Sequence, residues 1–159
     1  MRTIAYMVAL ALMLPLITSC EPRTIYSRYL PVNESAWKRA DTVTFCTDTV
    51  RHAGRHSLKC GVRLRRNYPY QNLALIIDRQ VVRKKRTISR GMERVSFQTI
   101  TPKGAPTGDG GAIKLIETGM SDMTLAVGDS VVIRVFHIMA REDIPGISDV
   151  GITIVNNED

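Results

Sequence analysis

Residues that carry enzyme or metal chemistry are scarce in this chain. Its 159 residues include three histidines, three cysteines and one tryptophan. His52 and His56 flank Gly54 in a segment of extended pattern, so their rings share no helical face of the kind that binds zinc. A Gly-x-Ser-x-Gly motif, which exposes a nucleophilic serine, does not occur. We therefore predict a protein that is not an enzyme, with no catalytic residue, no metal site and no cofactor.

Long apolar runs and helical stripes are missing after residue 20. Because a membrane-spanning helix needs about 20 apolar residues, no later segment is expected to cross a bilayer. No ten-residue window places apolar residues at helical spacing, and no internal repeat occurs. The chain after residue 20 has the size of one domain, which we expect to fold in water.

The first twenty residues have the pattern of a bacterial lipoprotein signal. Arg2 precedes an apolar run from Ile4 to Ile17, and Leu16-Ile17-Thr18-Ser19-Cys20 resembles a lipoprotein processing site. We predict a signal peptide over residues 1–19 and acylation of Cys20, including palmitate, which anchors the chain stably because several acyl chains are attached. An ordinary secretory signal with an incidental cysteine is the alternative. Residues 20–35 are expected to be a lipidated tether, and residues 36–159 a single domain.

Apolar residues recur at every second position in the domain, which is the spacing of a half-buried β-strand. In residues 56–65, Leu58, Cys60, Val62 and Leu64 alternate with polar or small residues. Weaker alternation occurs at residues 43–47, 73–82, 94–100, 113–118, 123–127, 131–139 and 150–155. Turn-forming residues separate these segments. About eight strands at this spacing predict an all-β fold, an antiparallel two-sheet β-sandwich of jelly-roll type.

Cys46 and Cys60 leave two interpretations open. A hairpin centred on Ala53 would set them opposite each other and favour a disulfide in an oxidising compartment. Alternation instead points Cys60 inward and turns Cys46 outward, because its neighbour Phe45 is the inward residue. Cysteines on opposite faces cannot be bridged without backbone movement, so the second interpretation is two free thiols.

Positive charge exceeds negative charge, with 22 Lys and Arg against 15 Asp and Glu. Most of the excess lies between Arg51 and Arg94. Lys59, Arg63 and Arg65 share the outward face of one predicted strand. Such a face would attract anionic lipid headgroups or an acidic partner. The plainer interpretation is a solvated face with no partner.

Two segments carry a resemblance to a known family. Tyr68-Pro69-Tyr70-Gln71-Asn72-Leu73 and the run from Met139 to Ile152, together with Trp37 and Arg63 before them, stand in the order and spacing of one family. On these residues the chain resembles the gliding-motility lipoprotein H (GldH) family of Bacteroidetes. The predicted lipidation of Cys20 agrees with it.

The resemblance implies a scaffold or stabilising component of a cell-envelope machine, associated with gliding motility and type IX secretion. Expected partners are the membrane, through the lipid anchor, and proteins of the envelope or gliding machinery, whereas location excludes nucleic acid. Because residues 21–24 lack an acidic run associated with surface export, we expect an outer-membrane lipoprotein facing the periplasm. The alternative is a glycan- or peptidoglycan-binding sandwich, which an exposed aromatic row among Tyr26, Tyr29, Tyr68 and Tyr70 would favour.

The resemblance also marks residues for a framework or interaction role. They are Trp37, Arg63, Tyr68, Pro69, Asn72, Arg141, Pro145, Gly146, Asp149 and Gly151. Pro145-Gly146 favours a tight turn, which we expect Asp149 to cap with Arg141 as its partner. Trp37 is expected to cover the core. A second interpretation is a partner-binding rim on loops held by the sandwich.

Overall fold

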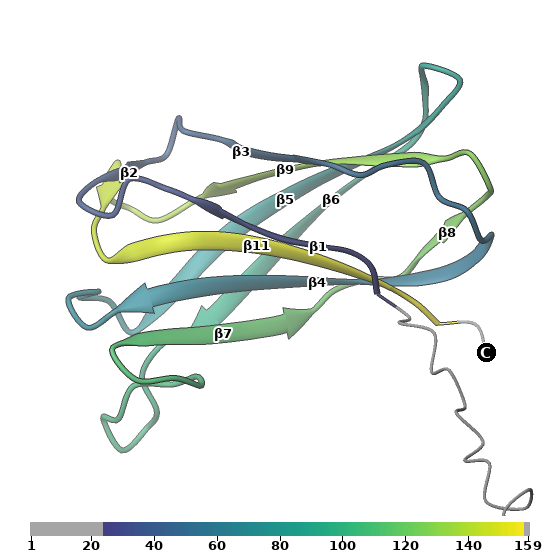
Figure 1. Ribbon diagram of the computed structural model, residues 1–159. Helices are drawn as coiled ribbons and strands as arrows, with labels where there is room; N and C mark the ends of the chain where they lie inside the picture. The colour runs from purple at the N-terminus through teal and green to yellow at the C-terminus, as the bar shows by residue number, and fades with distance from the viewer. Residues whose placement is uncertain (1–23, 158–159) are drawn as a thin grey trace, which may run out of the picture.

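The computed structural model describes residues 24–157, and its regular structure there is entirely β. This confirms the predicted all-β antiparallel fold (Figure 1). The strands are β1 (Thr24–Pro31), β2 (Trp37–Lys38), β3 (Val43–Cys46), β4 (Gly54–Arg65), β5 (Asn72–Arg83), β6 (Arg86–Gln98), β7 (Ile113–Gly119), β8 (Met123–Leu125), β9 (Ser130–His137), β10 (Asp143–Ile144) and β11 (Ile147–Asn156). The described residues contain no helix that is long and apolar enough to cross a membrane.

Two sheets form the layers of a sandwich. The first sheet has the order β1-β11-β4-β7, with β8 also paired to β4, and the second has the order β3-β9-β5-β6. Strands β2 and β10 form a small separate ladder. Figure 1 shows the two sheets packed with β4 and β11 in one layer and β5 and β9 in the other.

The core lies between the sheets and follows the predicted alternation. On β4, Leu58, Cys60 and Val62 are completely buried, whereas Lys59 and Arg65 are exposed. From the second sheet, β5 and β9 bury their own alternate residues against them, which include Leu73, Leu75, Ile77, Val131, Ile133 and Val135. Since each fully buried aliphatic side chain contributes about 1.5–3 kcal/mol, this shared layer is the main source of stability.

One expectation about the first part of the chain is wrong, and one of two open interpretations is excluded. Residues 24–31, expected to belong to the tether, form β1, which pairs antiparallel with β11 at the edge of the first sheet. The hairpin centred on Ala53, on which one of the two interpretations of Cys46 and Cys60 depends, does not form, because β3 pairs with β9 in the second sheet while β4 lies in the first. The strand expected at residues 94–100 begins earlier, at Arg86.

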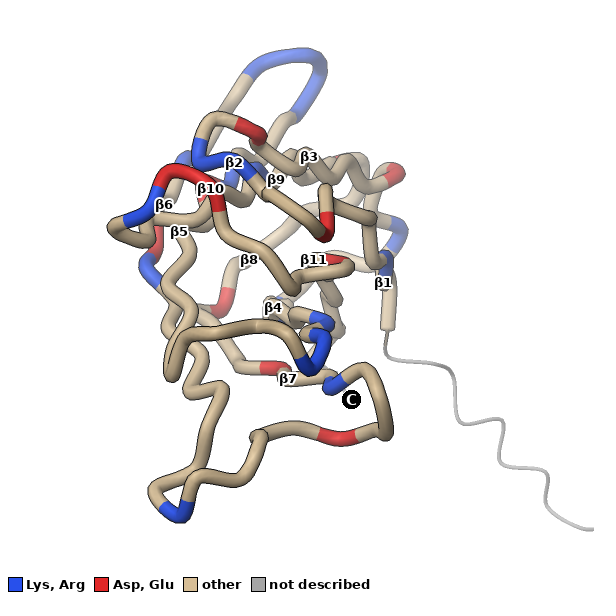
Figure 2. Tube along the Cα trace, turned by 90° about the vertical axis from the view of Figure 1, so that its left-hand side faces the viewer, with Lys and Arg blue, Asp and Glu red and all other residues tan. Residues whose placement is uncertain are grey.

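The sandwich has two ends, which hold different turns. The hairpin end holds Thr24, Gly54, Asn156 and the turn of the β5–β6 hairpin at residues 83–86 (Figure 1). The pocket end holds the turns at residues 65–71, 99–112 and 144–146. In Figure 2 the tip of the β5–β6 hairpin is blue throughout, the colour of Lys and Arg, and it projects from the body of the domain.

Candidate functional site

A row of four residues crosses the outer face of the first sheet. Tyr29, Gly151, Gly61 and Glu117 are successive cross-strand partners on β1, β11, β4 and β7. The Tyr29 side chain lies across both glycines, so a Cβ on Gly151 would stand 2.3 Å from Tyr29 Cε1 and one on Gly61 would stand 2.2 Å from its hydroxyl. The Tyr29 hydroxyl donates a 2.6 Å hydrogen bond to Glu117. One tyrosine thereby ties the edge strand β1 to the far strand of its sheet.

Arg63 and Asp149 flank this row. The Arg63 guanidinium lies 4.4 Å from the centre of the Tyr29 ring and 3.9 Å from the Asp149 carboxylate. Burial and the hydrogen bond to Glu117 raise the pKa of Tyr29, so the phenol stays a donor. Three residues marked by the resemblance are thus brought together here, because Arg63 and Gly151 lie against Tyr29 of β1 and Asp149 lies beside Arg63.

The expected role of Asp149 is wrong. Asp149 was expected to cap the turn at Pro145-Gly146 with Arg141 as its partner. Instead Asp149 stands opposite Arg63 in the β11–β4 ladder, and its carboxylate accepts a 2.7 Å hydrogen bond from Ser148 Oγ. The register of β11 against β4 decides that Asp149 pairs with Arg63, and turn preferences alone do not predict this register.

Sequence reasoning missed Tyr29, Gly61 and Glu117 as members of this cluster. A signal was present, because Gly61 and Gly151 each occupy an outward position within a predicted strand. Glycine inside a strand often marks a place where another group approaches closely. Which group approaches could not be read from the sequence, since β1 itself was not predicted.

The two family segments meet at the pocket end. Gly146 has φ of 83°, and a Cβ there would stand 2.6 Å from the backbone nitrogen of Tyr68. The Gly146 carbonyl accepts a hydrogen bond from the Arg65 amide, at 2.9 Å. The Tyr68 hydroxyl donates a 2.8 Å bond to the carbonyl of Asn72. Glycine is therefore required after Pro145, both for the left-handed backbone and for the close approach of the Tyr68-Pro69 turn.

Trp37 is buried, with 1% of its surface exposed, as expected for a residue that covers the core. Its indole donates a 2.8 Å hydrogen bond to the Asp41 carbonyl and its ring meets His137 edge-on at 5.1 Å. His137 Nε2 lies 3.1 Å from the Trp37 carbonyl, and burial lowers the pKa of this imidazole. The Arg141 side chain is exposed, while its carbonyl accepts a bond from Arg39.

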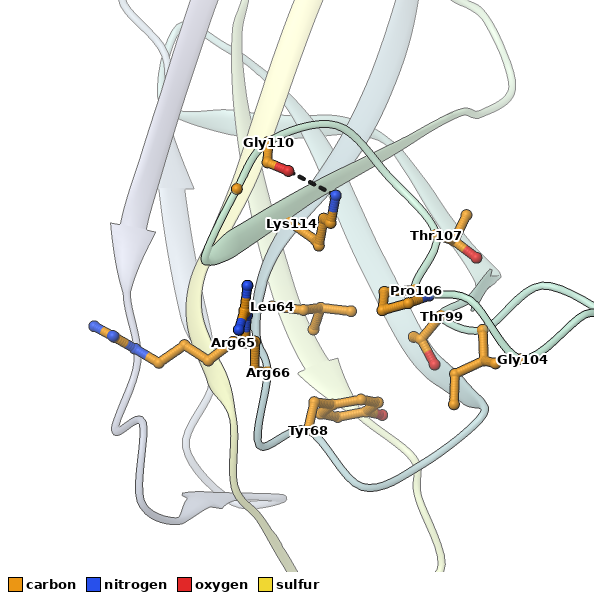
Figure 3. Close-up of a pocket in the computed structure, with 12 residues that line it drawn as sticks. Leu64, Arg65, Arg66, Tyr68, Thr99, Gly104, Pro106, Thr107, Gly110 and Lys114 are labelled. Carbon is orange, nitrogen blue, oxygen red and sulfur yellow. Dashed lines mark hydrogen bonds between the residues drawn. The ribbon is translucent and has the colours of Figure 1, made fainter.

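A cavity of about 590 Å³ opens at the pocket end. Leu64, Tyr68 and Pro106 supply apolar walls, and the glycine-rich loop at residues 104–111 forms one rim (Figure 3). The other lining residues are Arg65, Arg66, Thr99, Ile100, Gly104, Thr107, Gly110, Gly111 and Lys114. Burial raises the pKa of Tyr68, so its phenol is neutral.

The charged lining of this cavity is wholly basic. Lys114 donates a 2.6 Å hydrogen bond to the Gly110 carbonyl, which fixes the loop, and Arg65 pairs with Glu34 at 2.6 Å. Arg66 is exposed beside them. Thr107 Oγ1 is buried without a hydrogen-bond partner among the described residues. The cavity therefore fits an apolar group that carries negative charge or hydrogen-bond donors and acceptors.

Both cysteines described are free thiols. Cys60 is buried in the first sheet, and burial raises its pKa to about 12. Cys46 is exposed on β3 of the second sheet. The facing argument is confirmed, since Cys60 points inward, Cys46 is exposed and both thiols are free. No group of three or more His, Cys, Asp or Glu placed to hold a metal occurs in residues 24–157.

Comparison with known proteins identifies the family. The family model for the GldH lipoprotein matches residues 24–154. The chain belongs to the GldH lipoprotein family. It is therefore a membrane-anchored lipoprotein of a family linked to gliding motility, a family with no known enzymatic activity. No curated protein matches the chain.

Among solved structures, Eiger TNF from S. frugiperda is similar to this chain at 11% sequence identity and a TM-score of 0.36. The match covers 86% of this chain and 96% of the other.

Proposed function

We propose that this protein is a scaffold of the outer membrane, anchored by lipid at Cys20 and facing the periplasm, that stabilises an envelope machine of the gliding or type IX secretion kind. The observation that carries the proposal is where the family segments lie. Tyr68, Gly146 and their neighbours build the pocket end. Thr24, which follows Cys20 by four positions, lies at the opposite end. An anchored domain would therefore present the pocket end to partners away from its membrane.

The chemistry of the pocket end suits a protein partner better than a reaction. Its apolar walls and basic rim fit a side chain or chain terminus that carries a carboxylate, which Arg66 and Lys114 would attract. Glycan binding finds less support, because every aromatic side chain in residues 24–157 is buried or half-buried. Tyr29 lies over two glycines and Tyr68 is buried, so the exposed aromatic row that the alternative requires is not formed there.

Photo-crosslinking in intact cells tests the proposal. A crosslinking residue at Lys103, in the exposed loop of the pocket end, should capture proteins of the envelope machine, identified by mass spectrometry. Arg66→Glu with Lys114→Glu should reduce this capture, because the basic rim is reversed. Lys59→Glu, remote from the pocket, is the control and should leave capture unchanged. Capture of peptidoglycan fragments alone, unaffected by the rim variant, would contradict the scaffold and favour the glycan-binding alternative.

The anchor has its own test. Cys20→Ser removes the acylated thiol, so the protein should move from the membrane fraction to the soluble periplasmic fraction. Continued membrane association would contradict the lipid anchor. On intact cells, the wild-type protein should resist external protease, since it is expected to face the periplasm.

A further inference from the structure

The tip of the β5–β6 hairpin combines unfavourable backbone geometry with concentrated charge. Arg83 pairs with Arg86 across the ladder, so Lys84 and Lys85 are the two central residues of the turn. Both have positive φ, 47° and 65°, and they are the two non-glycine residues of the described chain that do. Asn-Gly is the sequence that such a turn favours. Two lysines there cost conformational energy, and unfavourable backbone of this kind is typically kept at functional sites.

Three of the four cations at this tip have no partner within the described residues. Arg83 is the exception, since its guanidinium forms two hydrogen bonds to Asp129, at 2.6 and 2.9 Å. Asp129 also accepts the Ala126 amide at 2.9 Å, so the hairpin is fixed to the loop beside it. Lys84, Lys85 and Arg86 are exposed and make no ion pair in residues 24–157. The base of the tip is thus held by hydrogen bonds, while its charge is available.

The tip lies at the end of the sandwich where the chain leaves toward the predicted anchor. Thr24, the first residue of β1, pairs with Val155 near the end of β11. Strand β4 lies beside β11 and begins at Gly54, which pairs with Leu125. Leu125 directly precedes the loop that holds Arg83. Figure 1 shows the hairpin tip and the start of β1 at the same end, on opposite layers. Thr24 follows Cys20 by four positions, a reach of at most about 14 Å.

We propose that Lys84, Lys85 and Arg86 form a second membrane contact that binds anionic lipid headgroups. The inference rests on the proposed lipid anchor, which holds the hairpin end near the bilayer. A lipid attached on the side of the first sheet and a cationic tip on the side of the second sheet give two separate points of contact. Two points leave only rotation about the line that joins them, so they limit the tilt of the domain and favour a pocket end that points away from the membrane. Among residues 24–157, the acids of this end are Asp48, Asp122 and Asp129, of which Asp122 pairs with Arg55 and Asp129 with Arg83.

Trypsin provides the test because it cleaves after the very residues proposed to bind. The purified, lipidated full-length protein is reconstituted on vesicles of phosphatidylcholine, with or without phosphatidylglycerol, and flotation verifies the attachment. Cleavage at residues 84–86 should be about tenfold slower on the anionic vesicles, and high salt should abolish the difference. Lys103, in the exposed loop at the pocket end, supplies an internal control that should be cleaved equally on both.

Two variants sharpen this test. Lys84→Asn with Lys85→Gly removes two charges and supplies the favoured turn, so the thermal midpoint should rise while the protection of Arg86 on anionic vesicles is lost. Lys59→Asn removes an exposed cation elsewhere and should keep the protection. Equal cleavage of the tip on both vesicles, in protein that floats, would overturn the second contact and leave the anchor intact.

Failure to float would instead overturn the anchor, and this inference with it. Protection seen only in native membranes, and not on pure lipid, would also overturn the proposal and point to an acidic protein as the tip's partner.

Discussion

Two basic regions of this protein look alike in sequence and differ in structure. On the outer face of β4, Arg63 lies against Tyr29 and near Asp149, and Arg65 pairs with Glu34. At the hairpin tip, Lys84, Lys85 and Arg86 have no partner among residues 24–157. The first region uses its charge to hold the fold together, while the second keeps its charge available. A count of lysines and arginines therefore does not locate a binding surface, because their partners must also be known.

Replacing Gly151 should give the largest effect. In Gly151→Ala the new methyl group would overlap the Tyr29 ring, so the ring must leave the face of the sheet and β1 loses its tie to Glu117. We expect a loss of about 2–3 kcal/mol in the free energy of unfolding, measured by chemical denaturation. Gly119→Ala is the matched control, because nothing lies within 4 Å of its Cβ position. Equal stability of the two variants would contradict the role given to the outer row.

Removing Asp129 tests the base of the hairpin. Asp129→Ala should cost about 2 kcal/mol, because Arg83 and the Ala126 amide lose their acceptor. Hydrogen bonds from Arg83 lower the pKa of Asp129 in the folded protein. Its stabilisation is thus complete above the ordinary value of 3.8 and is lost as the pH falls through the lowered folded value.

Acid titration of unfolding checks this second prediction. The wild type should lose stability below pH 3.8, and Asp129→Ala should lack that part of the loss. If the stability of Asp129→Ala fell with pH in the same way as that of the wild type, the Asp129 carboxylate would not be what holds the hairpin.

Charge reversal compares two cations of the first region, Arg63 and Lys59, within one strand. Arg63→Glu should cost about 1 kcal/mol, because the contact with Tyr29 is lost and a second acid is placed beside Asp149. Lys59→Glu, on the same face of β4, should change stability by less than about 0.5 kcal/mol. Thermal and chemical denaturation of both variants measure the difference. A similar loss in the two would mean that the whole face is structural.

The smallest effect should have the opposite sign. Lys84→Asn with Lys85→Gly should stabilise the protein by about 0.5–1 kcal/mol, because the turn no longer holds two lysines at positive φ. Denaturation of the double variant in the absence of lipid measures this gain. A loss of stability would mean that the lysines favour the fold, and the argument from unfavourable backbone geometry would no longer apply.

Much of the fold could be predicted because one face of each central strand is buried. Alternation in β4, β5 and β9 is regular for that reason, and it also placed Cys60 inward correctly. Strand β1 was missed because it is an edge strand whose residues are mostly exposed. The first half of β6 was missed for the same reason, since residues 86–90 are all exposed.

The candidate site was harder to predict than the fold. Turn chemistry explained Gly146 but misplaced Asp149, because the partner of a strand residue depends on register between segments far apart in sequence. Register between distant segments also explains why Arg63 has partners, whereas Lys85 has none among the described residues. Contacts of Arg63 come from β1 and β11, neither of which is adjacent to it in the chain.

The depth of the two basic regions in a bilayer shows whether the hairpin tip contacts lipid while the β4 face stays in water. Spin labels are attached at Thr87→Cys, beside the hairpin tip, or at Lys59→Cys, on β4, in lipidated protein whose exposed Cys46 is replaced by serine. Cys60 is buried and its raised pKa, about 12, keeps it unlabelled. On a bilayer containing anionic lipid, power saturation should place the Thr87 label at the headgroups and the Lys59 label in water. The reverse order would contradict the account, because the domain would then lie on its first sheet with its hairpin in solution.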